Sequence, residues 1–169
     1  MDVFEAVQTV LAVRQFKADP IPAEVVRQIV ESGHLTGSSI NGQPWHFIVV
    51  EDKAMLGQLG AMARSGPYIT QAPLAIIVAV AKSSPYGMSD GSRAIQSMVL
   101  TAWAAGVGSN WVGFANLAEV NAVVGLPEEY EIIAILPMGY PVNPASKGKK
   151  SRKPLGEIAS RERFGQAFE

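Results

Sequence analysis

Two segments of the chain combine polar side chains in patterns that could bind a ligand. The first, from Thr36 to Trp45, crowds hydroxyls, amides and glycines beside an aromatic ring. Such a loop offers many hydrogen-bonding groups and lets the backbone come close to a ligand, which suits a flat polar heterocycle. The same residues also suit an ordinary loop between a helix and a strand, and both interpretations stay open.

The second segment is a basic cluster near the end of the chain. Five cations fall within seven residues: Lys147, Lys149, Lys150, Arg152 and Lys153. Lysine and arginine together would bind the phosphate of a ligand well. Taken alone, however, these residues favour the alternative of a solvated basic tail.

Several other kinds of site are excluded or disfavoured. The chain has no cysteine, which rules out disulfides, thiolate metal sites and cysteine nucleophiles. Its two histidines form no HExxH pattern, so we expect no histidine-based metal site. The stretch that begins at Gly106 starts like a dinucleotide fingerprint but lacks a third glycine and follows a predicted helix, which is the wrong context. The chain has no GxxxxGK[ST] phosphate loop.

The composition indicates one globular domain. The chain has 169 residues, of which 48% are hydrophobic and 17% charged, and its net charge is −1. No global field therefore favours nucleic acid or an anionic membrane. The longest apolar run, residues 73–81, is too short to cross a bilayer as a helix, and the start of the chain does not resemble a signal peptide. We expect a soluble, cytoplasmic protein without a nucleic-acid partner.

Hydrophobic periodicity predicts the elements that must position these segments. We expect a helix from residue 3 that ends before Asp19, a second helix after Ile21, and strands over residues 45–50, 74–80, 109–114 and 132–136, the last one ended by Pro137. Further helices are expected over residues 53–62, 91–105 and 117–124. Helices and strands interleave, which predicts an α/β or α+β fold with helices packed on a central sheet. Residues 141–169 have too little apolar content for a core of their own and must lie on the body or on another subunit.

Four motifs occur in the order typical of one known family. They are Asn41-Gly42-Gln43-Pro44-Trp45-His46-Phe47 with the strand after it, Val13-Arg14-Gln15-Phe16, the stretch from Ala105 to Gly113, and Gly139-Tyr140-Pro141 followed by Lys150-Ser151-Arg152-Lys153-Pro154-Leu155. Together they span nearly the whole chain, and they resemble the nitroreductase family of FMN-dependent oxidoreductases.

The resemblance implies a fold, an assembly and an activity. The fold would be α+β, with a mixed, mainly antiparallel sheet between helices. Residues 1–169 would form a single domain whose 141–169 tail packs on the partner subunit of an intertwined homodimer. Each dimer would hold two FMN molecules at its interface. The enzyme would take hydride from NADH or NADPH and reduce a small acceptor such as a nitroaromatic or a quinone.

The resemblance also assigns roles to individual residues. Ser38, Ser39 and Asn41, with Gln43 of the same loop, would contact the flavin from one subunit. Arg14 would lie near the pyrimidine edge of the ring, where a fixed guanidinium stabilises the reduced form. Lys150 and Arg152 would hold the phosphate, and Trp111, Val112, Gly113 and Phe114 would line one side. No side chain is assigned a catalytic role, because the hydride chemistry belongs to the flavin.

The chain departs from the family pattern in one place that matters. Val10-Leu11-Ala12 stand where the family has Arg-Arg-Ser, so one charge-assisted contact to the cofactor is missing and we predict weaker FMN binding. The short Ser83–Gly87 stretch also leaves no room for the insertions that shape many substrate pockets of the family. Two alternatives therefore stay open: a flavin-binding carrier or sensor without turnover, and a degenerate dimeric scaffold.

Overall fold

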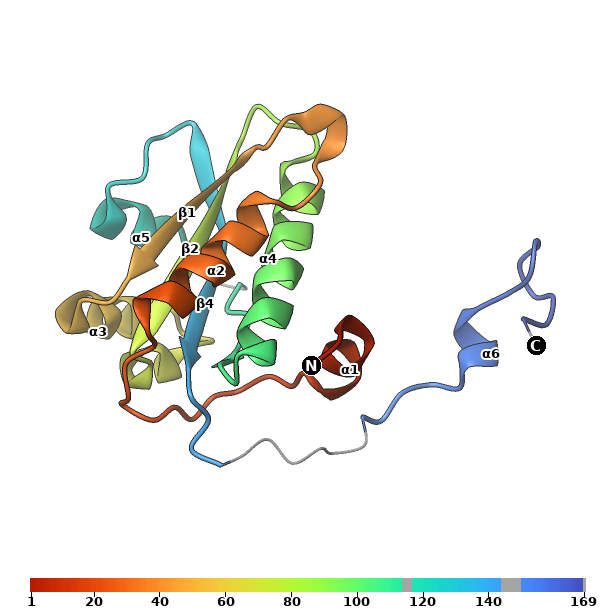
Figure 1. The fold of residues 1–169 in the computed structure, drawn as a ribbon. Coiled ribbons are helices and arrows are strands. Elements are labelled where there is room, and N and C mark those ends of the chain that lie inside the picture. Colours follow the sequence, from red (N-terminus) through yellow and green to blue (C-terminus); the bar gives the residue numbers. More distant parts are fainter. Residues whose placement is uncertain (114–116, 144–149, 169) are drawn as a thin grey trace.

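The protein folds around a four-stranded sheet (Figure 1). The structure, a computed structural model, describes residues 1–113, 117–143 and 150–168. The strands are β1 (Trp45–Val50), β2 (Leu74–Ala81), β3 (Gly108–Ser109) and β4 (Tyr130–Gly139), in the spatial order β1-β2-β4-β3 with antiparallel pairing throughout. Isolated bridges extend the sheet, and that between Ala12 and Ser109 is parallel.

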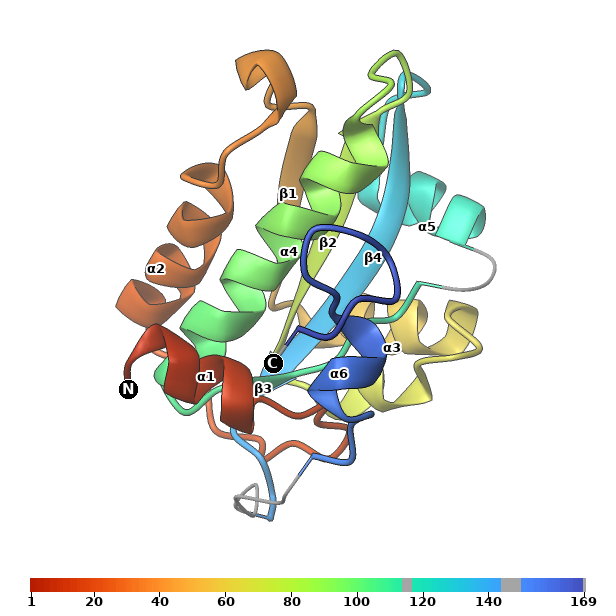
Figure 2. The ribbon, with the colours of Figure 1, turned by 90° about the vertical axis from the view of Figure 1, so that its right-hand side faces the viewer.

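Strand β2 organises two hydrophobic cores, one on each face of the sheet. Because successive side chains of a strand point to opposite faces, its even-numbered residues pack with α2 (Ala23–His34) and α4 (Gly87–Ala104). Ala75 and Ile77 face the other core, with α3 (Lys53–Met62), the 3₁₀ helix η2 (Pro67–Gln71) and α5 (Leu117–Val124). Figures 1 and 2 show helices on both sides of the sheet, which confirms the predicted fold class.

The prediction of one long first helix is wrong beyond its second turn. Helix α1 spans only Val3–Thr9, and the chain then runs extended along the end of the sheet. There the backbone N–H of Val13 donates to the Ser109 carbonyl at 2.9 Å, and that of Lys17 donates to the Tyr140 carbonyl at 2.8 Å. The sheet thus satisfies backbone groups that a helix would otherwise pair, and this tertiary pairing overrides the helical spacing of the apolar residues.

Pro137 does not end its strand, contrary to the prediction. It pairs with Ala75 within β4, which continues to Gly139. On the other side its carbonyl accepts a hydrogen bond from the Asn110 N–H at 3.3 Å, beside the two-residue strand β3. Proline is tolerated here because its missing N–H faces this short, irregular neighbour instead of β2.

The segment expected as a strand over residues 109–114 is only partly one. β3 ends at Ser109, and Val112 then forms an isolated bridge with Ile135 of β4. Phe114 lies outside the described residues. The strand is thus broken by Asn110 and Trp111, and this break has consequences for the site.

The tail carries almost no buried side chain. Beyond residue 150 it contains the short helix α6 (Leu155–Ile158) and a bridge between Ser160 and Ala167, and Figure 1 shows it extending away from the sheet. Its apolar residues Leu155, Ile158 and Phe164 are exposed, the last one completely. Within the described part of the chain, no helix has both the length and the apolar character needed to cross a membrane.

Candidate functional site

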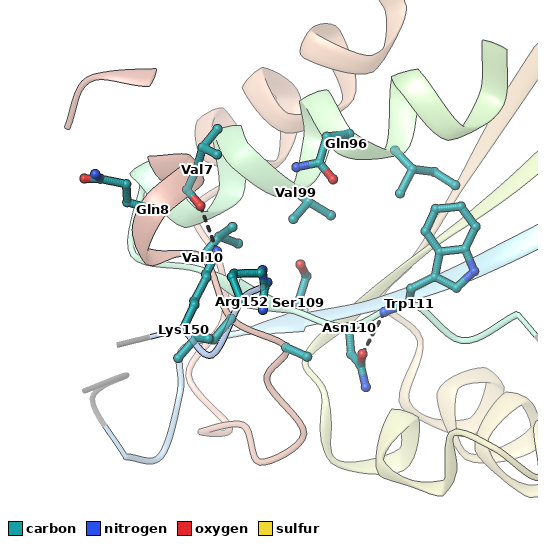
Figure 3. A pocket seen from close by; sticks show the side chains of 13 residues that line it. Val7, Gln8, Val10, Gln96, Val99, Ser109, Asn110, Trp111, Lys150 and Arg152 are labelled. Carbon is teal, nitrogen blue, oxygen red and sulfur yellow. Dashed lines mark hydrogen bonds between the residues drawn. The ribbon is translucent and has the colours of Figure 1, made fainter. Parts of the chain in front are cut away.

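A cavity of about 660 Å³ lies where α1, α4, the break after β3 and the start of the tail meet (Figure 3). This volume is in the range of small-molecule and cofactor sites. Its lining comes from segments far apart in sequence: Val7, Gln8, Val10, Leu11, Ala12, Ile95, Gln96, Val99, Ser109, Asn110, Trp111, Lys150 and Arg152.

One end of the cavity is cationic. Lys150 and Arg152, the pair assigned to the phosphate in the sequence analysis, both line it, and Lys150 Nζ donates a hydrogen bond to the Val7 carbonyl at 2.7 Å. Partial burial, and secondarily the charge of Arg152, lower the pKa of Lys150 from its ordinary value. Two neighbouring like charges repel each other, so an anion bound between them would relieve this repulsion. Lys147 and Lys149 of the same cluster lie outside the described residues.

The opposite side of the cavity carries Trp111, which Figure 3 shows well away from Lys150. Its backbone is fixed by Asn110, whose Oδ1 accepts from the Trp111 N–H at 2.9 Å and whose Nδ2 donates to the Tyr68 hydroxyl at 2.6 Å. Gly113 lies behind the indole, since a Cβ at this position would meet Trp111 Nε1 and Cδ1. Val112 is buried in the core with α3 and α5 and does not line the cavity.

Apolar residues occupy the wall near the cations. Val10, Leu11 and Ala12 line the cavity, and the sequence motifs predict that they stand in place of the Arg-Arg-Ser of the family pattern. A hydrogen bond of 2.9 Å from Trp103 Nε1 to Thr9 Oγ1 holds this wall against α4. The described lining therefore has two cations, both from the tail, and none from the segment that follows α1.

The remaining predicted site residues lie elsewhere on this protomer. Ser38, Ser39, Asn41 and Gln43 belong to the loop between α2 and β1, around the 3₁₀ helix η1 (Ser39–Asn41). Figures 1 and 2 both show η1 at the end of the molecule opposite α1. Arg14 is exposed beyond the apolar wall and does not line the cavity. The assignment to the cofactor stays a prediction for these five residues, for Val112 and Gly113, and equally for the cavity-lining Lys150, Arg152 and Trp111.

Several lining residues were not singled out from the sequence. Ser109 and Asn110 fall inside the stretch from Ala105 to Gly113 and could have been chosen from it. Gln8 and Gln96 carry no such signal, because only the packing of α1 against α4 brings them to one cavity.

Comparisons with known proteins give the chain a family. The family model described as "Nitroreductase family" matches residues 11–75 and 61–140. A Methanothermobacter thermautotrophicus protein described as "Putative NADH dehydrogenase/NAD(P)H nitroreductase" is 30% identical over 156 residues, 87% of this chain and 82% of the relative. An iodotyrosine deiodinase from Thermotoga neapolitana is 27% identical over 160 residues, 80% of this chain and 86% of its own.

A solved structure shares the fold across nearly the full length of both chains. The FMN-dependent nitroreductase from Clostridium difficile R20291 superimposes with a TM-score of 0.85 over 95% of this chain and 99% of its own, and is 23% identical. The four motifs in the sequence had indicated this relationship, and the match over residues 11–140 confirms it: the chain belongs to the nitroreductase family.

Proposed function

We propose that the protein is an FMN-dependent oxidoreductase that takes hydride from NADH or NADPH and reduces a small acceptor. The observation that carries the proposal is the cavity itself, which joins a two-cation end to apolar walls and an indole. A flavin mononucleotide has the same polarity, with an anionic phosphate at one end and a flat aromatic ring at the other. The residues present therefore fit this cofactor.

The chain's own residues would bind and orient the cofactor. Lys150 and Arg152 would hold the phosphate through charge-assisted hydrogen bonds. Val10, Leu11 and Val99 offer apolar surface to the rest of the molecule, and Asn110 holds the Trp111 backbone in place beside it. When bound, FMN would supply the hydride chemistry, while these residues hold and orient it.

The proposal includes a homodimer of single-domain subunits. The Ser38–Gln43 loop does not line the cavity of its own protomer, and the tail has its apolar residues exposed. In a homodimer, the loop of the second copy would complete the flavin site, and the body of the second copy would cover the tail. Residues 1–169 would then form one domain, with residues 141–169 packed on the partner.

A visible absorption spectrum tests the proposal. The purified protein is incubated with FMN, freed of excess cofactor, and then treated with NADH or NADPH without air. We expect a retained flavin spectrum that bleaches on reduction and recovers when a nitroaromatic, a quinone or a halogenated phenol is added. The halogenated phenol is included because one relative is an iodotyrosine deiodinase. The variant with Lys150→Ala and Arg152→Ala serves as the control, and it should retain little flavin.

One observation favours a second candidate, a flavin carrier or sensor. The apolar Val10-Leu11-Ala12 wall removes cationic contacts that would hold the cofactor firmly through repeated turnover. Flavin that is retained but not bleached by either nicotinamide would support this candidate against the enzyme. If no flavin is retained at all, both flavin functions are wrong and a scaffold role takes their place.

A further inference from the structure

Asp90 is a buried carboxylate that the proposed chemistry does not use. It lies in the first turn of α4 and is only 1% exposed. A buried charge is costly unless it is paired and hydrogen-bonded, so its partners indicate why it is there. Arg93, one turn further along α4 and largely exposed, approaches Asp90 Oδ1 at 3.4 Å.

The closer partner of Asp90 is one residue of the loop between α2 and β1. The Ser39 N–H donates to Asp90 Oδ2 at 3.0 Å, and the Ser39 hydroxyl donates to Asp90 Oδ1 at 3.0 Å. Both carboxylate oxygens thus hold one serine, 51 residues away in sequence. Hydrogen bonds to a charged acceptor are stronger than those between neutral groups, so Asp90 holds the loop to α4 through Ser39.

The backbone conformation of the loop is unfavourable and must be stabilised by interactions such as the Ser39–Asp90 hydrogen bonds. Ile40, Asn41 and Gln43 all have positive φ, at 50°, 56° and 44°. This region is unfavourable for residues with a side chain, and especially for a β-branched one such as Ile40. Ile40 is also 89% exposed, so burial of its side chain does not stabilise the conformation. Strained backbone of this kind persists only where the surroundings enforce it.

The loop is fixed at both ends and open in the middle. Ser39 is bonded to α4, and at the other end the Pro44 carbonyl accepts from the Ala81 N–H of β2 at 2.8 Å. Between these anchors, Asn41 and Gln43 are exposed. We propose that Asp90 is a positioning residue for the flavin site: through Ser39 it holds the Ser38–Gln43 loop in the shape that presents these groups to the cofactor. This inference rests on the proposed function.

Amide hydrogen exchange tests, without any cofactor, whether Asp90 holds the Ser38–Gln43 loop in place. In the Asp90→Ala variant we expect faster exchange at Ser39, Asn41 and Gly42, whose N–H groups are all bonded in this loop, and unchanged exchange in β2. The matched control is Asp52→Ala, which removes an exposed carboxylate that accepts from the Met55 N–H at 2.8 Å and caps α3. Exchange over the loop equal to that of the unsubstituted protein would overturn the proposal.

Flavin affinity then tests the link to function. We expect Asp90→Ala to weaken FMN binding about tenfold or more, the size expected for losing hydrogen bonds to a charged group. Asp90→Asn should recover part of the affinity, because the amide oxygen can accept from the Ser39 N–H while the amide NH2 donates to the Ser39 hydroxyl oxygen. Adding Asp90→Ala to the Ser39→Ala variant should weaken FMN binding less than Asp90→Ala does in the unsubstituted protein, since the two residues act as a pair.

The outcomes separate this inference from the proposed function. Faster loop exchange with unchanged FMN affinity would overturn Asp90 as a positioning residue. Equal effects on loop exchange and on exchange throughout the core would also overturn it, because they would indicate a general structural role. If the unsubstituted protein binds no FMN, the proposed function fails, and the exchange measurement alone decides whether Asp90 holds the loop.

Discussion

At the scale of single residues, the described cations of the cavity come from one segment of the chain. Lys150 and Arg152 belong to the tail, while Val10 and Leu11 present hydrocarbon where arginines are expected. The phosphate of a bound FMN would therefore be held from one side. Restoring a cation on the other side should strengthen binding without changing the rest of the site.

We predict that Val10→Arg tightens FMN binding about tenfold, as expected for one added charge-assisted hydrogen bond. Val10 is half-buried and lines the cavity, so an arginine here can reach the cationic end. The dissociation constant is measured by the change in flavin fluorescence on binding. The control is Val3→Arg, which adds the same charge at a residue that is 76% exposed and does not line this cavity.

The comparison with riboflavin gives this prediction a second check. Because the new guanidinium acts on the phosphate, Val10→Arg should leave riboflavin binding unchanged. An equal gain for both flavins would contradict the mechanism, and no gain for FMN would contradict the alignment of Val10 with the arginine of the family.

At the scale of elements, the wall of the cavity depends on how α1 is attached. This helix has only 7 residues, which is too few to be stable without tertiary contacts. Its last residue, Thr9, accepts a hydrogen bond from Trp103 Nε1 at 2.9 Å, and the indole is largely buried. The bond therefore joins the end of α1 to α4, directly before the apolar wall begins at Val10.

We predict that Thr9→Val lowers the free energy of unfolding by about 1–3 kcal/mol, because the buried Trp103 N–H is left without its acceptor. Urea denaturation followed by tryptophan fluorescence measures this loss. The control is Thr70→Val, since Thr70 is exposed and bonds only the nearby Pro67 carbonyl, at 2.9 Å. A change there should stay within about 0.5 kcal/mol. Equal losses of unfolding free energy in both variants would show that the Thr9–Trp103 hydrogen bond does not contribute more to stability than the exposed Thr70–Pro67 bond.

The sequence predicted elements well where local pattern and tertiary structure agree. The helix over Lys53–Met62 has the expected bounds, and the buried strand at Leu74 begins as expected and runs one residue further, to Ala81, because helical spacing and continuous apolar runs describe these elements directly. Prediction failed where pairing with a distant strand decided the backbone, as in the segment after Thr9 and at Pro137.

The site could be predicted only where it coincides with motifs. Lys150, Arg152 and Trp111 were found this way and do line one cavity. Asp90 was missed because its importance depends on Ser39, which is 51 residues away and meets it only in the folded chain. Nothing in the local pattern of α4 distinguishes this carboxylate from an ordinary residue of a first helical turn.

At the scale of the whole molecule, the tail determines the assembly that we expect. It exposes Leu155, Ile158 and Phe164 at 52%, 66% and 105% of their reference areas. Burying such side chains stabilises a contact by about 25 cal/mol for each Å² of apolar surface removed from water. The tail shown in Figure 1 offers this area to another surface, and a second copy of the chain would use it.

We predict that the double variant Ile158→Ser and Phe164→Ser dissociates the proposed dimer, because it removes most of the apolar surface of the tail. Sedimentation equilibrium should give about twice the 18.0 kDa chain mass for the unsubstituted protein and a value near the chain mass for the variant. The control exchanges two polar tail residues, Glu157→Ser and Arg163→Ser, and should remain a dimer. FMN binding should fall together with the dimer, since the partner's loop would complete each site. A variant that stays dimeric, or a monomer that binds FMN as tightly as the unsubstituted protein, would show that the tail and the shared site are not linked in this way.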